Sequence, residues 1–180
     1  KALGRLGPVD LRHFFISSER ATFTYTKPIL IHPGHPPQEL SRLDTKNWTP
    51  TPSDVRRRIA TSLEAVLKSC DAVIVMDQVE VESTGVVTPE VLDTLREHSA
   101  GRLVLADSRR GLAHFPPCLF KMNASELSLL FKKLQGADDL AIERQATELA
   151  RKNGCPAVIT LAEKGILGAN PDGSVWTTPA

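Results

Sequence analysis

Two periods of apolar and polar positions divide the chain into helices and strands. Val55, Ile59 and Leu63 are spaced to share one face of a helix, and Ser53 before them is a typical N-cap residue. A continuous apolar run at 71–76 is typical of a strand that is covered on both faces. The same patterns predict helices from 88, near 124–134 and at 138–153, with strands at 103–106, 118–121, 157–161, 166–169 and 174–178.

The first fifty residues follow a different pattern. Residues 21–27 alternate between polar side chains and β-branched or aromatic ones, which predicts a strand that continues after Pro28. Because Pro28 has no amide proton to donate, this strand is expected at a sheet edge or a bulge. The other elements predicted here are a helix end followed by a short strand at 14–16, a turn-rich loop at 32–37 and a returning strand at 40–44.

The order of elements and the composition together indicate an α/β fold with a mostly parallel central sheet flanked by helices. The 180 residues are 41% hydrophobic and 24% charged, which is typical of a soluble globular domain. A net charge of +1 provides no field for nucleic acid or for an acidic membrane surface, so neither is expected as a partner. The three cysteines lack a C-x-x-C motif, as expected of reduced thiols in a cytoplasmic protein.

Polar side chains follow three successive predicted strands, and these are the candidates for binding chemistry. Asp107 ends one strand, Lys121 ends the next, and a turn from Thr160 to Gly165 follows the third. In an open α/β sheet, ligands bind outside the carboxyl ends of the strands. The strand that ends at Lys121 leads directly to a helix start near Asn123, a local geometry that favours phosphate.

Each candidate also has a purely structural explanation. Asn123 and Glu126 are spaced as a capping box, but an amide and a carboxylate at a strand end also suit Mg²⁺ held through water. Asp107 either caps the following turn or is a ligand in the cleft, and Asp77 after the run at 71–76 has the same two interpretations. Neither a P-loop nor a dinucleotide fingerprint is present in the sequence. The residues alone therefore indicate an α/β domain that uses phosphate or a nucleotide.

The candidate residues occur in an order and spacing that resemble the ribokinase/PfkB family of carbohydrate kinases. The segments that carry the resemblance are Asp77, Asp107-Ser-Arg-Arg110, Lys121-Met-Asn-Ala-Ser-Glu126 and Val158-Ile-Thr-Leu-Ala-Glu-Lys-Gly165. Through Thr24–Pro28 and Arg42–Asp44, the sequence is most similar to the branch that contains the heptose-7-phosphate kinases of ADP-heptose synthesis. The resemblance covers nearly the whole chain, but only the middle of a family member.

The resemblance implies transfer of the γ-phosphoryl group of ATP, with Mg²⁺, to a hydroxyl of a sugar or sugar phosphate. It implies a ribokinase-like fold in which residues 1–50 supply the sugar-side strands of a lid, as an N-terminal edge β element, and residues 51–180 form the nucleotide-side core. A homodimer through the N-terminal β element is also expected. The implied site residues are Lys121, Asn123, Glu126, Thr160, Glu163 and Gly165 for ATP and its phosphates, Asn123 and Glu126 for Mg²⁺ through water, and Lys27, Asp77 and Asp107 for the substrate or the cleft.

The sequence also departs from the family pattern. The N-terminal Gly-rich sugar-binding segment and the C-terminal G-A-G-D segment have no counterpart, and the catalytic Asp and anion hole of the latter are expected beyond Ala180. We therefore interpret the chain as an internal fragment that carries no catalytic residue and is inactive alone. Residues 78–85 replace a short D-Y-x-K-G segment of the heptose branch, and Ala162 stands where Gly is common. The alternatives are a non-catalytic ribokinase-fold module that binds nucleotide or sugar, and an α/β domain without a ligand.

Overall fold

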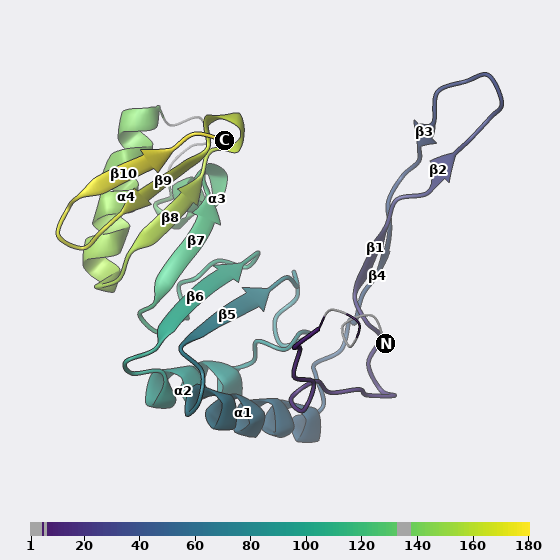
Figure 1. Cartoon of the computed structure of the whole chain (residues 1–180), viewed down its shortest axis with the longest axis horizontal. Helices are drawn as coiled ribbons and strands as arrows, with labels where there is room; N and C mark the ends of the chain where they lie inside the picture. The colour runs from purple at the N-terminus through teal and green to yellow at the C-terminus, as the bar shows by residue number, and fades with distance from the viewer. Residues whose placement is uncertain (1–4, 6, 133–137) are drawn as a thin grey trace.

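The computed structural model describes residue 5, residues 7–132 and residues 138–180, and a six-stranded sheet forms its centre (Figure 1). The strand order is β10-β9-β8-β7-β6-β5, in which β5 to β8 pair in parallel and β8, β9 and β10 pair antiparallel. The mostly parallel sheet predicted from the sequence is confirmed. The strands are β5 (Ala72–Asp77), β6 (Leu103–Ser108), β7 (Leu119–Asn123), β8 (Ala157–Thr160), β9 (Ile166–Ala169) and β10 (Val175–Thr178).

Local backbone chemistry accounts for several helix boundaries. Pro89 occupies the first position of its helix, where a missing amide proton costs nothing, and Gly154 ends another helix at φ 68°. The prediction for Ser53 was wrong: Pro52 stands at the N-cap position, and Ser53 is the first helical residue. The helices are α1 (Ser53–Leu67), α2 (Pro89–His98), α3 (Ala124–Leu130), α4 (Asp139–Asn153) and a short 3-10 turn, η2 (Ala162–Lys164).

The helix predicted near 124–134 ends earlier than expected. Its α-helical part stops at Leu130, and Phe131 occupies the C-cap position. The last two predicted positions, 133 and 134, lie outside the described residues. Among the described residues, no helix is both long enough and apolar enough to cross a membrane.

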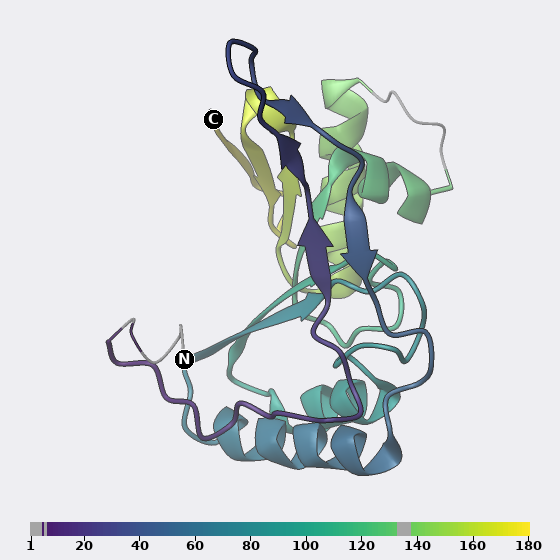
Figure 2. The same cartoon turned by 90° about the vertical axis from the view of Figure 1, so that its right-hand side faces the viewer.

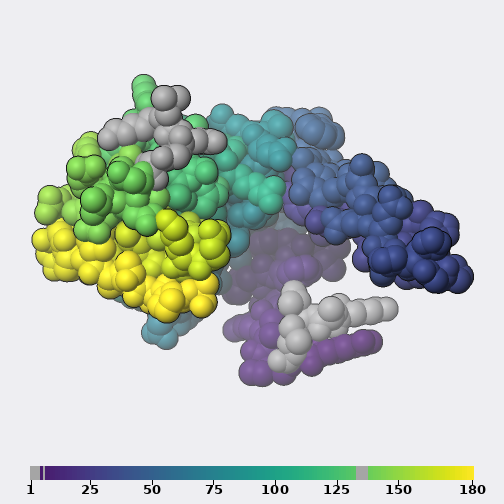
Figure 3. All heavy atoms as spheres, turned by 90° about the horizontal axis from the view of Figure 1, so that it is seen from above, coloured from purple at the N-terminus to yellow at the C-terminus, as the bar shows by residue number. Residues whose placement is uncertain are grey.

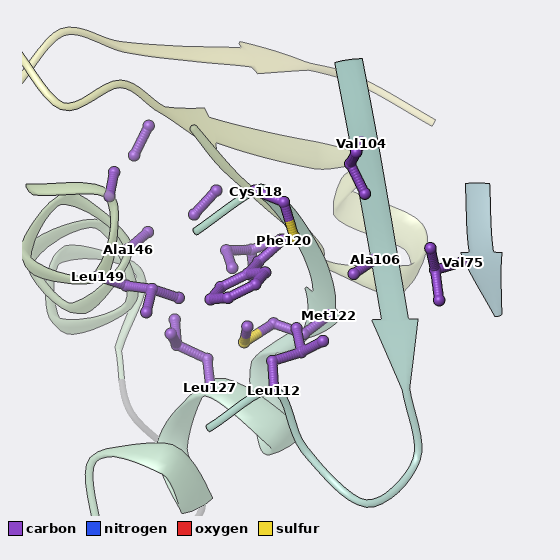
Figure 4. Packing of buried hydrophobic residues seen from close by; sticks show 14 of the residues in the cluster. Val75, Val104, Ala106, Leu112, Cys118, Phe120, Met122, Leu127, Ala146 and Leu149 are labelled. Carbon is purple, nitrogen blue, oxygen red and sulfur yellow. The ribbon is translucent and has the colours of Figure 1, made fainter. Parts of the chain in front are cut away.

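One hydrophobic core lies between the sheet and the helices (Figure 4). Phe120 and Met122 point from β7 toward helix residues such as Leu127 and Leu149, and all four side chains are buried. Residues of α1, α2, α3 and α4 all belong to this one cluster. The described helices therefore pack on the face of the sheet that carries these strand residues.

The opposite face of the sheet corrects a prediction from the sequence. The run at 71–76 was expected to be covered on both faces, but Ile74 is 69% exposed, Met76 48% and Leu103, on the next strand, 57%. These residues alternate with the core residues of β5 and β6, so they lie on the side that the described helices leave open.

The N-terminal β element forms a ribbon of its own, defined here as residues 24–45, which projects from the body (Figures 1, 2 and 3). It consists of two antiparallel pairs, and Pro28 separates the first strands of the two pairs. The predicted strand at 21–27 is shortened, the returning strand is shifted, and residues 14–16 form no strand. The pairs are β1 (Thr24–Thr26) with β4 (Leu43–Thr45) and β2 (Ile29–Leu30) with β3 (Gln38–Glu39).

Gln145 is the basis of a stability prediction. It lies on α4 at 2% exposure, and neither its amide nitrogen nor its amide oxygen has a hydrogen-bond partner in the described structure. Because a buried unpaired polar group is costly, Gln145→Leu should raise the free energy of unfolding by about 1–2 kcal/mol in urea denaturation. Gln38→Leu on the exposed ribbon is the control and should change stability by less than about 0.5 kcal/mol. A Gln145→Leu protein that is less stable than wild type would contradict the interpretation of Gln145 as a buried, unpaired amide.

Candidate functional site

The carboxyl ends of β7 and β8 bring three of the predicted residues together. Asn123 pairs in register with Thr160 across the two parallel strands. Both line a cavity of about 650 Å³, which we call the strand-end cavity, and Gly165 lines it as well. Its walls also include residues of η2 and the first residues of α3 and α4. The expected convergence of strand ends is therefore present for this part of the site.

Asn123 and Glu126 form the capping box that their spacing predicts. The Oδ1 atom of Asn123 accepts a hydrogen bond from the Glu126 amide at 2.8 Å, and Glu126 Oε2 accepts one from the Asn123 amide at 2.8 Å. The structural explanation of the motif is confirmed. The two bonds use one oxygen of each side chain, which leaves Glu126 Oε1 with no hydrogen bond among the described residues.

Glu126 also lines a second, smaller cavity of about 240 Å³. The loop after β6 forms its other wall through Ser108, Arg109 and Arg110. The capping box thus stands between the two cavities, with Asn123 on the strand-end cavity and Glu126 on the smaller one.

Lys121 and Asp107 form an ion pair on the side of the sheet opposite to the core. Lys121 Nζ lies 2.8 Å from Asp107 Oδ2, and their side chains are 36% and 13% exposed. This pair provides the partner that a lysine at the end of an apolar strand needs. Neither residue is among those that line the strand-end cavity.

Asp77 is buried at the end of β5 and bonds to residues at the end of β6 and in the loop after it. Its Oδ2 atom accepts hydrogen bonds from Ser108 Oγ at 2.9 Å and from Arg110 Nε and Nη2 at 3.1 and 2.8 Å. Its Oδ1 atom is buried and has no partner in the described part of the chain. The sequence did not assign Arg110 this role, because the contact depends on the register of β5 on β6, which places Asp77 opposite Ser108 and so brings the following loop close to it.

Two predicted residues stand apart from these groups. Lys27 lies on the ribbon and pairs with Glu39 at 2.8 Å, with both side chains more than half exposed. Glu163 is exposed in η2, next to the residues that line the strand-end cavity. The structure therefore places the predicted residues in several groups along one edge of the sheet and on the ribbon.

The turn from Thr160 to Gly165 contains features that sequence reasoning missed. Lys164 lines the strand-end cavity and pairs with Asp139 at 2.8 Å, and this contact raises the pKa of the lysine. Gly165 has a φ of 92°, and a Cβ atom there would lie 2.0 Å from the carbonyl oxygen of Thr178. Only glycine fits at this position, which explains the Lys-Gly sequence at the end of the turn.

A separate apolar cavity of about 620 Å³ lies between residues 13–23 and α1. Phe14, Phe23 and Leu63 are among its lining residues, and none of the predicted site residues is. Because its exposed lining is mostly apolar and includes none of the predicted site residues, we assign the site to the strand ends. Cys118 is no candidate nucleophile either, since burial raises the pKa of its thiol to about 12.

The comparisons with known proteins concern the fold. No protein-family model matches the sequence, and no curated protein sequence matches it significantly. Solved structures do match: phosphofructokinase-2 from Escherichia coli in complex with potassium has a TM-score of 0.58 and 17% identity, over 77% of this chain and 46% of that one. Ribokinase from Giardia lamblia has a TM-score of 0.53 and 12% identity, over 87% of this chain and 48% of that one.

The fold is ribokinase-like. The chain spans just under half of the length of these solved structures. At such low identity the likeness establishes how the ribokinase-like elements are arranged and leaves the chemistry to be argued from the site itself.

Ala162 provides a test of the turn geometry. It adopts a φ of 52°, which is left-handed and strained for any residue with a Cβ atom. Ala162→Gly should therefore raise the free energy of unfolding by about 1 kcal/mol, measured by urea denaturation. The matched control is Ala65→Gly in the exposed part of α1, which should lower it by about 1 kcal/mol because glycine is a poor helix former. If both substitutions destabilise the protein equally, the turn is not strained at Ala162.

Proposed function

We propose that this protein is an ATP-dependent sugar kinase that transfers the γ-phosphoryl group of ATP to a hydroxyl of a sugar or sugar phosphate. The observation that carries the proposal is the strand-end cavity, where Asn123, Thr160 and Gly165 meet at the carboxyl edge of the sheet. Ligands of open α/β sheets bind at this edge. The ribokinase-like fold supports the proposal, because the solved structures that share it include phosphofructokinase-2 from Escherichia coli in complex with substrates and products (TM-score 0.56, 17% identity).

In this proposal the strand-end cavity holds the nucleotide. The turn from Thr160 to Gly165, with Glu163 exposed in it, covers ATP, and Asn123 binds its phosphates. Lys121 contributes a positive charge two residues before Asn123 on β7, where Asp107 keeps its ammonium group in place. Phosphoryl transfer depends on positioning and on charge neutralisation, and residues at several strand ends suit this requirement.

The residues at the capping box also fit Mg²⁺ bound through water. Glu126 has an oxygen that the capping bonds leave unused, and no cluster of three acidic, histidine or cysteine side chains exists in the described residues to hold the ion directly. Mg²⁺ usually keeps several waters and takes only one or two carboxylates beside substrate phosphates. Bound there, the ion would neutralise charge on the transferred phosphoryl group.

The sugar side is assigned to the ribbon and the neighbouring strand ends. Lys27 lies on the ribbon, and Asp77 and Asp107 end β5 and β6. Because Asp77 is 1% exposed and bonded to Arg110, we propose that it acts by holding this guanidinium in place. The general base belongs, in this proposal, to the G-A-G-D segment expected beyond Ala180, so the 180 residues alone bind substrates without turnover.

A second candidate function is a ribokinase-fold module that binds nucleotide or sugar without catalysis. It is favoured by the structural contacts that the same side chains already make: the capping box, the Lys121–Asp107 pair and the buried Asp77 all have partners within the chain. The two functions differ in one assay. A kinase, provided with the G-A-G-D segment, converts ATP to ADP in the presence of its sugar, whereas a binding module gains stability with ATP and forms no ADP.

We also propose that the protein is cytoplasmic and forms a homodimer through the ribbon. The ribbon exposes several large apolar side chains, among them Ile29 at 58%, Ile31 at 73% and Leu43 at 64%. A two-stranded ribbon with such side chains is marginally stable in water unless another surface covers it. One of the matching solved structures is the tetrameric inhibited form of phosphofructokinase-2 from Escherichia coli (TM-score 0.54, 18% identity), which is an assembly of that protein.

Glu126→Gln separates the capping role from the proposed Mg²⁺ role. Glutamine at this position still completes a capping box, so the unfolding temperature without ligand should stay within about 1–2 °C of wild type. Removing the carboxylate charge should weaken binding of Mg²⁺-ATP by roughly 10- to 100-fold. Wild type at about 100 times Kd should gain about 2.7 kcal/mol, and the variant clearly less, in a thermal-shift titration with Mg²⁺-ATP.

The control is Glu143→Gln, which removes a charge from the exposed side of α4 and touches neither of the two cavities nor the capping box. This variant should retain most of the Mg²⁺ dependence. The proposal fails if wild type shows no thermal shift with Mg²⁺-ATP, or if Glu126→Gln responds to it as wild type does.

The ribbon dimer is tested by sedimentation. Ile31→Lys combined with Leu43→Lys places charges on the exposed apolar side chains of the ribbon and should raise the dimer dissociation constant by roughly 100-fold or more. Ile74→Lys is the control, because Ile74 is equally exposed at 69% but lies on the open sheet face. A monomeric wild type, or dissociation by Ile74→Lys alone, would refute a dimer through the ribbon.

A further inference from the structure

The base of the ribbon meets the body through a series of alternating charges whose two end members, both arginines, lie over one aromatic ring. Arg42 pairs with Asp44 at 2.7 Å, Asp44 with Lys46 at 3.4 Å, and Lys46 with Glu80 at 2.8 Å. Glu80 in turn lies 4.0 Å from Arg109. The guanidinium groups of Arg109 and Arg42 both lie over the ring of Tyr25, at 5.2 and 4.9 Å from its centroid. Tyr25 thus connects the last member of this series to the first.

The ring of interactions spans two parts of the molecule. Tyr25, Arg42 and Asp44 lie on the ribbon, and Lys46 follows it directly, whereas Glu80 and Arg109 lie on the loops after β5 and β6. Gln78 connects the ribbon and the body a second time. Its backbone carbonyl oxygen accepts a hydrogen bond from the Tyr25 hydroxyl at 3.2 Å, and its side-chain Oε1 accepts one from Arg109 Nε at 3.0 Å. We call these contacts the ribbon clasp.

A second attachment lies where the two chain segments that flank the ribbon join the body. We call these contacts of Arg20 and Thr51 the root, and they are less exposed than the clasp. Thr51, which is 5% exposed, donates a hydrogen bond through its hydroxyl to the carbonyl of Gly85 at 2.7 Å. Arg20 donates to the carbonyl of Thr84 at 2.6 Å. The root is therefore fixed by partly or fully buried hydrogen bonds, while the clasp consists of charges whose side chains are 15–53% exposed.

We propose that the ribbon clasp is a reversible latch that holds the base of the ribbon, formed by β1 and β4, at the carboxyl edge of the sheet, with the root as the fixed end. The difference between the two attachments supports this. Exposed ion pairs are individually weak and are screened by salt, whereas buried hydrogen bonds are neither. When the clasp opens, the root keeps the ribbon attached and the ribbon loses only its outer support. The latch does not rest on the proposed kinase function.

The latch also follows from the marginal stability of the ribbon. Two-stranded pairs are weak in water on their own, and β1 and β4 have only three residues each. Tyr25 and Asp44 face each other in the register of this pair, so the clasp acts directly on it. Release of the clasp should therefore appear as faster local opening of β1 and β4, without loss of the core.

Hydrogen exchange followed by mass spectrometry tests the latch in the absence of ATP and sugar. Tyr25→Leu removes both guanidinium–ring contacts and the bond to Gln78, and should accelerate exchange at 24–26 and 43–45 by about tenfold. Arg109→Gln and Glu80→Gln, both on the body side, should each accelerate it by a smaller factor. In wild type, high NaCl should accelerate exchange in the ribbon and leave α4 unchanged.

Arg58→Gln is the matched control, because Arg58 lies 5.0 Å over the ring of Phe15 and is not part of the clasp. It should leave exchange in the ribbon as in wild type. The latch is refuted if Arg109→Gln and Glu80→Gln exchange like wild type in the ribbon, or if Arg58→Gln accelerates it equally. Because no nucleotide is added, a negative result leaves the kinase proposal standing, and a failure of nucleotide binding leaves the latch standing.

Discussion

The parallel pairing of β5, β6, β7 and β8 is the constraint on which the site depends. Parallel strands end at the same edge, and their register decides which polar residues become neighbours. The register of β5 on β6 places Asp77 beside Ser108, and that of β7 on β8 places Asn123 beside Thr160. A shift of one residue in any of these pairs would turn the side chains to the other face. The candidate site is therefore a property of the register as much as of the residues.

The hydrophobic core and the Lys121–Asp107 ion pair lie on opposite faces of the sheet. The described helices all pack on one face, where the buried strand residues lie, and their packing fixes the positions of the strands. Lys121 and Asp107 lie on the opposite face, where solvent still reaches them. Charged groups can thus stand close to the core without the full cost of burial. The ribbon approaches the same edge from outside, through the charges around Tyr25.

Features that depend on local sequence could be predicted. Features that depend on which distant segments of the chain pair with each other could not. The capping box at Asn123 and the end of a helix at 153 follow from a few neighbouring residues, and both are confirmed. The bond from Arg110 to Asp77 joins positions 33 residues apart and requires the strand register. Coverage on both faces was predicted for 71–76 because an apolar run does not reveal on which side helices pack. The shortened strand at 24–26 reflects a ribbon without a sheet on which to extend.

The most direct test of the account is to map nucleotide binding onto the backbone by NMR, with ¹⁵N-labelled protein titrated with Mg²⁺ and a non-hydrolysable ATP analogue. If phosphate is held where the parallel strands end, the largest amide shifts will lie at 123–126 and 160–165, around the strand-end cavity. Shifts that are largest in residues 13–23 and α1, around the apolar cavity, would contradict the account, and so would a spectrum that saturating analogue leaves unchanged.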